Sequence, residues 1–252
     1  MNLLVVDIGN SDTVLGIWKP NDALPEVFRI ETTSFLQSSG QASLAFDQMH
    51  LNSRDLDLIV ISSVVPLVTD QVIIELTKYT SLKIKVLDQF QFTKLPIEVL
   101  KPDEIGTDLV ANALAAHTTL HKDCIIVDFG TALSFTTVDR HGKIVGVSIA
   151  PGLQTALKAL TAHTAQLQSV PLVMPPSSLG KNTEEAIQTG ILYGYDGLVR
   201  GIVAAQEKEL GRDLFVIVTG GLSHAIPSLK NRVDLYSPFL TLEGLKIAAE
   251  YI

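Results

Sequence analysis

The sequence has few of the residues that several classes of protein depend on. Its 252 residues include one cysteine, Cys124, which lies inside an apolar run, so disulfide frameworks and cysteine-based metal sites are excluded. There is no basic run and the net charge is −8, which argues against a nucleic-acid-binding surface. The six histidines do not have the spacing of zinc ligands.

Long hydrophobic runs are missing as well. Asp7 interrupts the first apolar run, and no basic region precedes it, unlike in a signal peptide. No stretch approaches the roughly 20 apolar residues that cross a bilayer. With 46% hydrophobic and 18% charged residues, the chain has ample material for a core. We therefore expect a soluble cytoplasmic protein without a membrane partner.

One motif occurs twice, about half the chain apart. In each copy an apolar run reaches an aspartate, and a glycine follows two positions later: Asp7 with Gly9, then Asp128 with Gly130. A carboxylate at the end of a buried strand is costly to desolvate unless it is paired or bound to a cation. The glycine lets a ligand approach the main chain closely. The repetition predicts two related lobes, each headed by a phosphate-and-metal turn, whereas either copy alone also fits an ordinary hairpin.

The remaining pattern predicts an α/β fold. Residues 1–104 are expected to form an N-terminal lobe and residues 105–252 a C-terminal lobe, with a cleft between them. The helix that begins at Pro66 is expected to bury Leu67, Ile73, Ile74 and Leu76. Further strands are expected at 26–31, 57–63, 83–87, 143–149 and 215–219, and helices at 66–79, 105–117, 154–161, 182–210 and 240–251.

Two features have alternative interpretations. Asp108, at the start of a predicted helix, is either a helix cap or a catalytic acid or base. Gly220 and Gly221 follow a predicted strand and form either a nucleotide-binding turn or a plain tight turn. The glycines at 190, 194, 197 and 201 would let helices pack closely, including across a dimer interface.

The order and spacing of several motifs resemble those of type III pantothenate kinases over nearly the whole length. This family belongs to the superfamily of sugar kinases, heat-shock ATPases and actin, so the resemblance implies two duplicated ribonuclease H-like lobes in an actin-like ATPase fold. The matching pieces are Asp7-Ile8-Gly9-Asn10-Ser11, Ser62-Ser63-Val64-Val65-Pro66, Gly106-Thr107-Asp108, Asp128-Phe129-Gly130-Thr131-Ala132, Ile149-Ala150-Pro151-Gly152-Leu153, Gly180-Lys181-Asn182-Thr183 and Thr219-Gly220-Gly221.

The resemblance implies an ATP-dependent phosphorylation of pantothenate, the first step towards coenzyme A. It implies that Asp108 is the catalytic base, that Asp7 holds Mg²⁺, and that Asp128 lies by a monovalent cation, K⁺ or NH₄⁺. It further implies a homodimer in which Thr183 reaches the substrate of the neighbouring subunit. It assigns Gly9, Asn10, Ser11, Gly130, Thr131, Gly220 and Gly221 to ATP and its phosphates, and Gly106, Thr107, Leu109 and Thr183 to the acceptor.

Three positions depart from the family pattern. Leu109 stands where an arginine normally follows the catalytic aspartate, Val99 stands near the place of a usual tyrosine, and Thr136 stands where an aspartate is frequent. The retained Asp108 argues that the chemistry survives, while the missing arginine argues against unaltered recognition of pantothenate. Two alternatives therefore remain: a kinase of a different small alcohol, and a catalytically silent nucleotide-binding or regulatory homologue.

Overall fold

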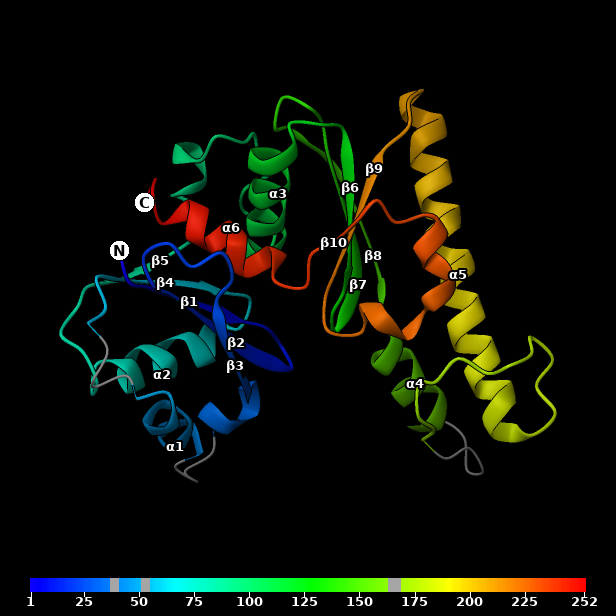
Figure 1. The fold of residues 1–252 in the computed structure, drawn as a ribbon, viewed down its shortest axis with the longest axis horizontal. Coiled ribbons are helices and arrows are strands. Elements are labelled where there is room, and N and C mark those ends of the chain that lie inside the picture. The colour runs from blue at the N-terminus through cyan, green and yellow to red at the C-terminus, as the bar shows by residue number, and fades with distance from the viewer. Residues whose placement is uncertain (37–40, 51–54, 163–168) are drawn as a thin grey trace. The chain divides into compact units, whose positions relative to one another are not determined.

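The computed structural model of the chain describes residues 1–36, 41–50, 55–162 and 169–252 (Figure 1). It divides into unit 1, which is Met1–Thr119 with Leu240–Ile252, and unit 2, which is Leu120–Phe239. The strands are β1 Leu3–Ile8, β2 Asp12–Trp18, β3 Glu26–Glu31, β4 Leu58–Ser63, β5 Ile84–Val86, β6 Cys124–Phe129, β7 Ala132–Val138, β8 Ile144–Pro151, β9 Phe215–Thr219 and β10 Leu235–Tyr236. The α-helices are α1 Gln41–Gln48, α2 Pro66–Leu76, α3 Thr107–Leu120, α4 Leu153–Ala162, α5 Thr183–Leu210 and α6 Leu240–Ala248. Short 3₁₀ helices are η1 Thr32–Phe35, η3 Phe92–Lys94, η4 Ser223–Ala225 and η5 Pro227–Asn231.

Unit 1 is built on a five-stranded mixed sheet. The strand order is β3-β2-β1-β4-β5, with β3, β2 and β1 antiparallel and β1, β4 and β5 parallel. The sheet lies between α1 and α2 on one side and α3 and α6 on the other (Figure 1). Alternate residues of β1 enter the core against α2, namely Leu4, Val6 and Ile8. Because side chains alternate along a strand, Asp7 belongs to the opposite face.

Unit 2 repeats this plan. Its strand order is β10-β9-β6-β7-β8, again with two antiparallel pairs on one side of the central strand and two parallel pairs on the other. Here Ile125, Val127 and Phe129 of β6 join a core that includes residues of α4 and α5. Asp128 consequently belongs to the other face of its sheet, as Asp7 does in unit 1. The predicted duplication and the α/β fold class are therefore confirmed.

The long helix of unit 2 has clear signals at both ends. The Asn182 side chain accepts a hydrogen bond from the amide of Glu185 at 2.9 Å, which satisfies one of the unpaired donors of the first turn. At the other end Gly211 adopts a left-handed conformation, with φ 66°, and terminates the helix. The helix lies where the sequence predicted it, over Thr183–Leu210.

The predicted inner face of α2 was right at Leu76 and wrong at Leu67 and Ile74. Leu67 and Ile74 are 78% and 54% exposed, while the helix buries Val68, Val72 and Leu76. Apolar residues occupy most positions of α2, so periodicity alone does not identify the buried stripe. Packing on the sheet buries the stripe formed by Val68, Val72 and Leu76.

The units also differ from the predicted lobes, which were divided after residue 104. Both α3 up to Thr119 and the distant α6 belong to unit 1. The Thr241 hydroxyl donates to the Asn112 side-chain oxygen at 2.8 Å. Gly244 lies so close to α3 that an added Cβ would stand 1.9 Å from the Ala111 carbonyl oxygen, so only glycine fits at this helix crossing. These contacts far apart in sequence tie both helices to unit 1.

Candidate functional site

The first aspartate turn joins β1 to β2. Asp7 is partly buried and is the next-to-last residue of β1, and the following turn is closed by a hydrogen bond from the Gly9 amide to the Asp12 carbonyl at 3.0 Å. The Thr32 hydroxyl donates to the Gly9 carbonyl at 2.7 Å, and the Thr32 amide donates to the Ser11 carbonyl at 2.9 Å. Thr32 therefore fixes the turn from the side, while Asn10 and Ser11 are exposed at its tip.

The end of β4 brings hydroxyl groups next to this turn. Ser62 pairs in register with Asp7 across the parallel β1–β4 ladder. Its hydroxyl is 2.8 Å from that of Thr107, the first residue of α3. The Thr107 hydroxyl also donates to the Ser63 carbonyl at 3.2 Å. Unit 1 thus places the beginning of α3 beside the strand end that carries Asp7.

Asp108 lies in the first turn of α3. One of its carboxylate oxygens accepts the amide of Leu109 at 2.8 Å. Burial raises the pKa of Asp108 above its ordinary value, and this hydrogen bond offsets the rise only in part. Asp108 therefore accepts a hydrogen bond from a backbone amide in the first turn of the helix, as a capping residue does. Its carboxylate is also more basic than that of an ordinary aspartate. Leu109 is 8% exposed, so its side chain is mostly buried in unit 1.

The second aspartate turn joins β6 to β7 and is closed by a hydrogen bond from the Gly130 amide to the Ala132 carbonyl at 3.1 Å. Other segments enclose it through the Thr131 carbonyl. That oxygen accepts the amide of Gly152 at 3.1 Å and the hydroxyl of Thr155 at 2.6 Å. Because Thr155 lies in the first turn of α4, the helix begins against the turn that follows Asp128.

The glycine pair after β9 contacts the same turn. Gly220 has φ 91°, and an added Cβ would lie 2.6 Å from both the Asp128 carboxylate and the Phe129 backbone. Positive φ and close packing each require glycine here. Thr219, immediately before it, pairs in register with Asp128, as Ser62 does with Asp7. Unit 2 therefore brings Asp128, Gly130, Thr131 and Gly220 together.

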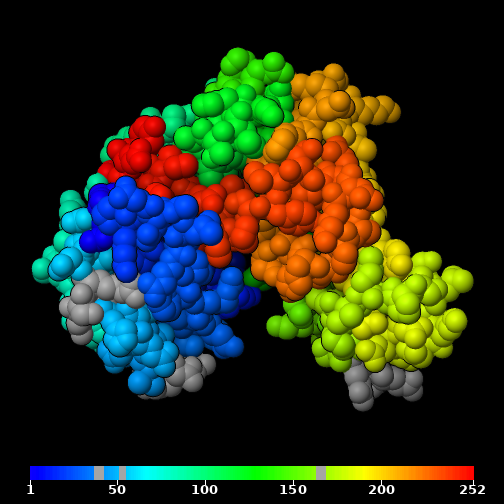
Figure 2. All heavy atoms as spheres, viewed as in Figure 1, coloured from blue at the N-terminus to red at the C-terminus, as the bar shows by residue number. Residues whose placement is uncertain are grey.

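The remaining predicted acceptor residue, Thr183, is the first residue of α5 and is exposed. This start of α5 and the loop before it, in yellow-green, lie at the surface in Figure 2. Sequence analysis assigned no role to Ser62, Gly152 or Thr155, although Ser62 and Gly152 lie within family motifs. The motifs are the only sequence signal that could have drawn attention to Ser62 and Gly152. Their hydrogen-bond partners are known only from the structure.

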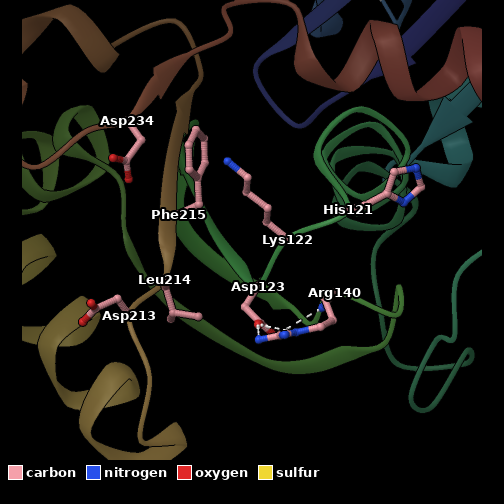
Figure 3. A pocket seen from close by; sticks show the side chains of 8 residues that line it. All are labelled: His121, Lys122, Asp123, Arg140, Asp213, Leu214, Phe215 and Asp234. Carbon is pink, nitrogen blue, oxygen red and sulfur yellow. Dashed lines mark hydrogen bonds and ion pairs between the residues drawn. The ribbon is translucent and has the colours of Figure 1, made fainter.

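A pocket of about 450 Å³ opens at the other end of the sheet of unit 2 (Figure 3). It surrounds Asp123, just before β6, whose carboxylate accepts the Arg140 guanidinium at 2.9 Å and pairs with Arg212 at 3.1 Å. Burial raises the pKa of Asp123, but the hydrogen bonds from Arg140 and the charges of both arginines outweigh it, and the net shift is downward. The lining residues are His121, Lys122, Asp123, Arg140, Asp213, Leu214, Phe215 and Asp234.

This pocket lies at the opposite end of the sheet of unit 2 from the Asp128 turn. Ligands of α/β sheets bind outside the carboxyl ends of the parallel strands, where Asp128 and Gly220 lie. The pocket instead adjoins the amino ends of β6 and β9. Its ionic groups are mostly paired, since Asp234 also accepts the Val216 amide at 2.7 Å. We therefore take each of the two aspartate turns, one in either unit, as a candidate functional site.

Among the residues that the structure describes, no helix has the length and apolar character needed to cross a membrane. Within the same residues, no three His, Cys, Asp or Glu side chains gather as a ready-made metal cage. A metal at Asp7 would thus need ligands from elsewhere, and phosphate oxygens of a nucleotide are common ligands for Mg²⁺.

Comparison with known proteins identifies relatives over nearly the full length. Residues 3–205 match the family model of type III pantothenate kinases. The type III pantothenate kinase of Geobacillus sp. (strain WCH70) is 38% identical over 98% of this chain and 97% of its own. That of Thermobifida fusca is 35% identical over 98% of each chain. Among solved structures, the ethanolamine utilization protein EutJ from Carboxydothermus hydrogenoformans shares the fold, with a TM-score of 0.57 and 14% identity, covering 98% of this chain and 89% of that one.

Proposed function

The chain belongs to the type III pantothenate kinase family, and from this premise we propose that it transfers the γ-phosphate of ATP to the hydroxyl of pantothenate, forming 4′-phosphopantothenate and ADP. The observation that carries the proposal is the position of Asp108, a partly buried carboxylate with a raised pKa in the turn of α3 that is hydrogen-bonded to the end of β4. Phosphoryl transfer needs positioning, neutralisation of charge and one group to orient the nucleophile.

In the proposed reaction, the Asp108 carboxylate takes the proton of the acceptor hydroxyl as its oxygen attacks the γ-phosphorus. The bond between the γ-phosphorus and the bridging oxygen breaks, and ADP leaves with that electron pair. A buried carboxylate with a raised pKa is a better proton acceptor than an exposed one. The helix donor that it satisfies holds its carboxylate in place.

The phosphates are assigned to the two turns. Gly9, Asn10 and Ser11 would contact them from unit 1, since Asn10 and Ser11 are exposed at the tip of a turn fixed by Thr32. Gly130 and Thr131 would contribute from unit 2, with Gly220 and Gly221 against the nucleotide. The start of α4 beside the Thr131 carbonyl supports this assignment, because helix N-termini favour anions.

Two cations complete the proposal. Carboxylate oxygens suit Mg²⁺, and Asp7 provides a carboxylate at the end of β1, so Asp7 is the proposed protein ligand. When bound with ATP, Mg²⁺ neutralises charge on the transferred phosphoryl group. Asp128, paired in register with Thr219, is proposed to lie by K⁺ or NH₄⁺. An acidic chain whose one thiol is buried suits a reducing compartment, so we place the enzyme in the cytoplasm.

The acceptor is assigned to Gly106, Thr107, Leu109 and Thr183. Leu109 favours a second candidate, a kinase of a different small alcohol, because an apolar side chain cannot make the charged contact of the usual arginine. Such a contact contributes about 1.5–3 kcal/mol. That corresponds to roughly ten- to 150-fold in affinity.

We further propose a homodimer formed along α5. An added Cβ at Gly190, Gly194, Gly197 or Gly201 would meet nothing within 4 Å, and these glycines are exposed. Their spacing sets them along one side of the helix, where a second helix can approach closely. Thr183 at the start of α5 would then reach the acceptor of the partner subunit.

Coupled ADP release tests the function. The purified protein should release ADP with ATP, Mg²⁺, K⁺ and pantothenate, and omission of K⁺ should lower the rate. The same assay with other small alcohols in place of pantothenate tests the second candidate, a kinase of a different alcohol, which predicts faster ADP release with one of them. ATP binding without turnover on any alcohol would overturn the kinase proposal and indicate the catalytically silent homologue.

A further inference from the structure

Ser62 lies between two residues to which the proposed function gives roles. Its side chain is fully buried at the end of β4, and its backbone pairs in register with Asp7. Paired residues on neighbouring strands lie about 5 Å apart and project to the same face. The Ser62 hydroxyl and the Asp7 carboxylate therefore share the face of the sheet on which α6 packs.

The Ser62 hydroxyl reaches α3. It is 2.8 Å from the hydroxyl of Thr107, which itself donates to the Ser63 carbonyl. A hydroxyl carries one proton, so Ser62 supplies the proton of the Ser62–Thr107 bond. The first residue of α3 is thereby attached to β4 by two hydrogen bonds, and Asp108 is the next residue along the chain.

We propose that Ser62 is a positioning residue: its hydrogen bond to Thr107 holds the first turn of α3, and with it the Asp108 carboxylate, at a fixed offset from Asp7. The inference rests on the proposed function, which gives Asp7 and Asp108 their roles. A displacement of about 1 Å at a reacting group lowers rates by up to about 100-fold. A single buried hydroxyl can therefore affect turnover without contacting any substrate.

Ser62→Ala removes the hydroxyl, and Ser63→Ala is its matched control. Ser63 is the next residue of the strand, and its hydroxyl instead accepts the Val65 amide at 3.0 Å and the Thr69 hydroxyl at 2.7 Å, at the start of α2. We expect Ser62→Ala to lower kcat about tenfold with KM for ATP within about twofold, and Ser63→Ala to keep kcat. Ser62→Thr retains a hydroxyl and should restore most of the rate.

A second pair of variants tests whether the effect passes through Thr107. Thr107→Val keeps the shape and removes the hydroxyl. Because Thr107 is also assigned to the acceptor, this pair is compared by hydrogen exchange of the Val110 amide, which donates to the Gly106 carbonyl in the first turn of α3. If Ser62 acts through its bond to Thr107, adding Thr107→Val to Ser62→Ala should speed this exchange little further, because residues that share one interaction are non-additive. Independent, multiplying increases in the exchange rate would overturn the proposed connection.

Amide hydrogen exchange gives a readout that does not depend on turnover. The Val110 amide donates to the Gly106 carbonyl at 3.2 Å and the Leu109 amide to Asp108, so both report on the first turn of α3. Ser62→Ala should speed exchange at these amides about tenfold, and Ser63→Ala should not. If the native protein turns over no alcohol, the proposed function fails while this measurement still decides the role of Ser62. Unchanged exchange and kcat in Ser62→Ala, or a lower Tm with unchanged kcat, would overturn it.

Discussion

The two aspartate turns share a strand plan but are held in different ways. In unit 1 four residues separate the last ladder pair, Ile8 and Thr13, and in unit 2 three residues separate Phe129 and Leu133. Thr32 holds the first turn from the side. The second is enclosed by Gly152, Thr155 and Gly220. Duplication preserved the sheet, and divergence lies in the segments that surround each turn.

The two units also differ in the direction in which they shift the pKa of one aspartate. Asp108 in unit 1 is partly buried and accepts hydrogen bonds from backbone amides, and burial dominates its raised pKa. Asp123 in unit 2 is buried against two arginines, and its pKa falls. These opposite shifts fit the proposed role of Asp108 as a proton acceptor and a structural role for Asp123. The predictions below test this division, from the largest expected effect to the smallest.

Asp108→Asn should abolish most turnover, with a loss of about 10²–10⁴-fold, because the loss of a general base typically has that effect. ATP affinity should change little. Initial rates by coupled ADP release and ATP binding by calorimetry measure the two quantities. A rate near that of the native protein would remove Asp108 from its proposed role.

The same substitution should raise Tm at pH 7. A carboxyl whose folded pKa is raised favours the protonated form in the folded state, so ionisation destabilises the fold as pH rises. Asparagine cannot ionise and avoids this cost. Below roughly pH 3, where an ordinary aspartate is protonated in the unfolded chain too, the gain should disappear. Thermal unfolding at both pH values measures it, and an equal gain at both would contradict the assignment.

Asp7→Asn and Asp128→Asn are matched changes in the two turns. We expect Asp7→Asn to lower kcat about 100-fold through loss of the proposed Mg²⁺ ligand. Asp128→Asn should lower it about tenfold and abolish the response to K⁺, since a monovalent cation neutralises less charge. Titrations of Mg²⁺ and K⁺ on both variants separate the roles. Equal losses of kcat, with the same response to Mg²⁺ and K⁺ in both variants, would contradict the assignment of Mg²⁺ to Asp7 and the monovalent cation to Asp128.

Gly220→Ala should destabilise unit 2 by about 1–3 kcal/mol, because its left-handed backbone and its contact with Asp128 both exclude a side chain. Gly146→Ala in β8 is the control, since an added Cβ there meets nothing within 4 Å. Denaturant unfolding compares the free energies of unfolding of the two variants. Similar values would show that Gly220 is not constrained.

Asp123→Asn should lower the free energy of unfolding at pH 7 by about 1–2 kcal/mol, the size of a hydrogen bond to a charged group whose partners are partly exposed. The lowered pKa means that this stability is present above the unfolded pKa and is lost as pH falls through the folded one. The difference from the native protein should therefore vanish in acid. Turnover should be retained, because this residue lies at the end of the sheet away from Asp128. A loss of turnover without a loss of stability would contradict that separation.

Local signals in the sequence predicted most of the strands and α-helices and both turns. Strand β3 lies at the predicted residues, and the apolar runs around Asp7 and Asp128 form hairpins as expected. Period-two alternation and a glycine after an acidic residue are properties of a few neighbouring residues. Whether the two aspartates face one shared polyphosphate stays a prediction.

What the sequence could not predict depends on contacts distant along the chain. The buried stripe of α2, the attachment of α6 to α3 at Gly244 and the hydrogen bond from Ser62 to Thr107 all join segments that no local pattern relates. The raised pKa of Asp108 likewise follows from burial by the surrounding chain. Ser62 lies within a family motif, but its partner is known only from the fold.

The return of α6 to unit 1 has a consequence for biosynthesis. Unit 2 is one continuous segment, so all of its residues are synthesised before residue 240. Unit 1 begins first yet lacks α6 until residues 240–252 emerge, although it contains the proposed base. Since domains fold as units during synthesis, the later-encoded unit can be complete first. A nascent chain arrested before residue 240 would contain Asp7 in β1 and Asp108 in α3, but the sheet of unit 1 would still lack one of its covering helices.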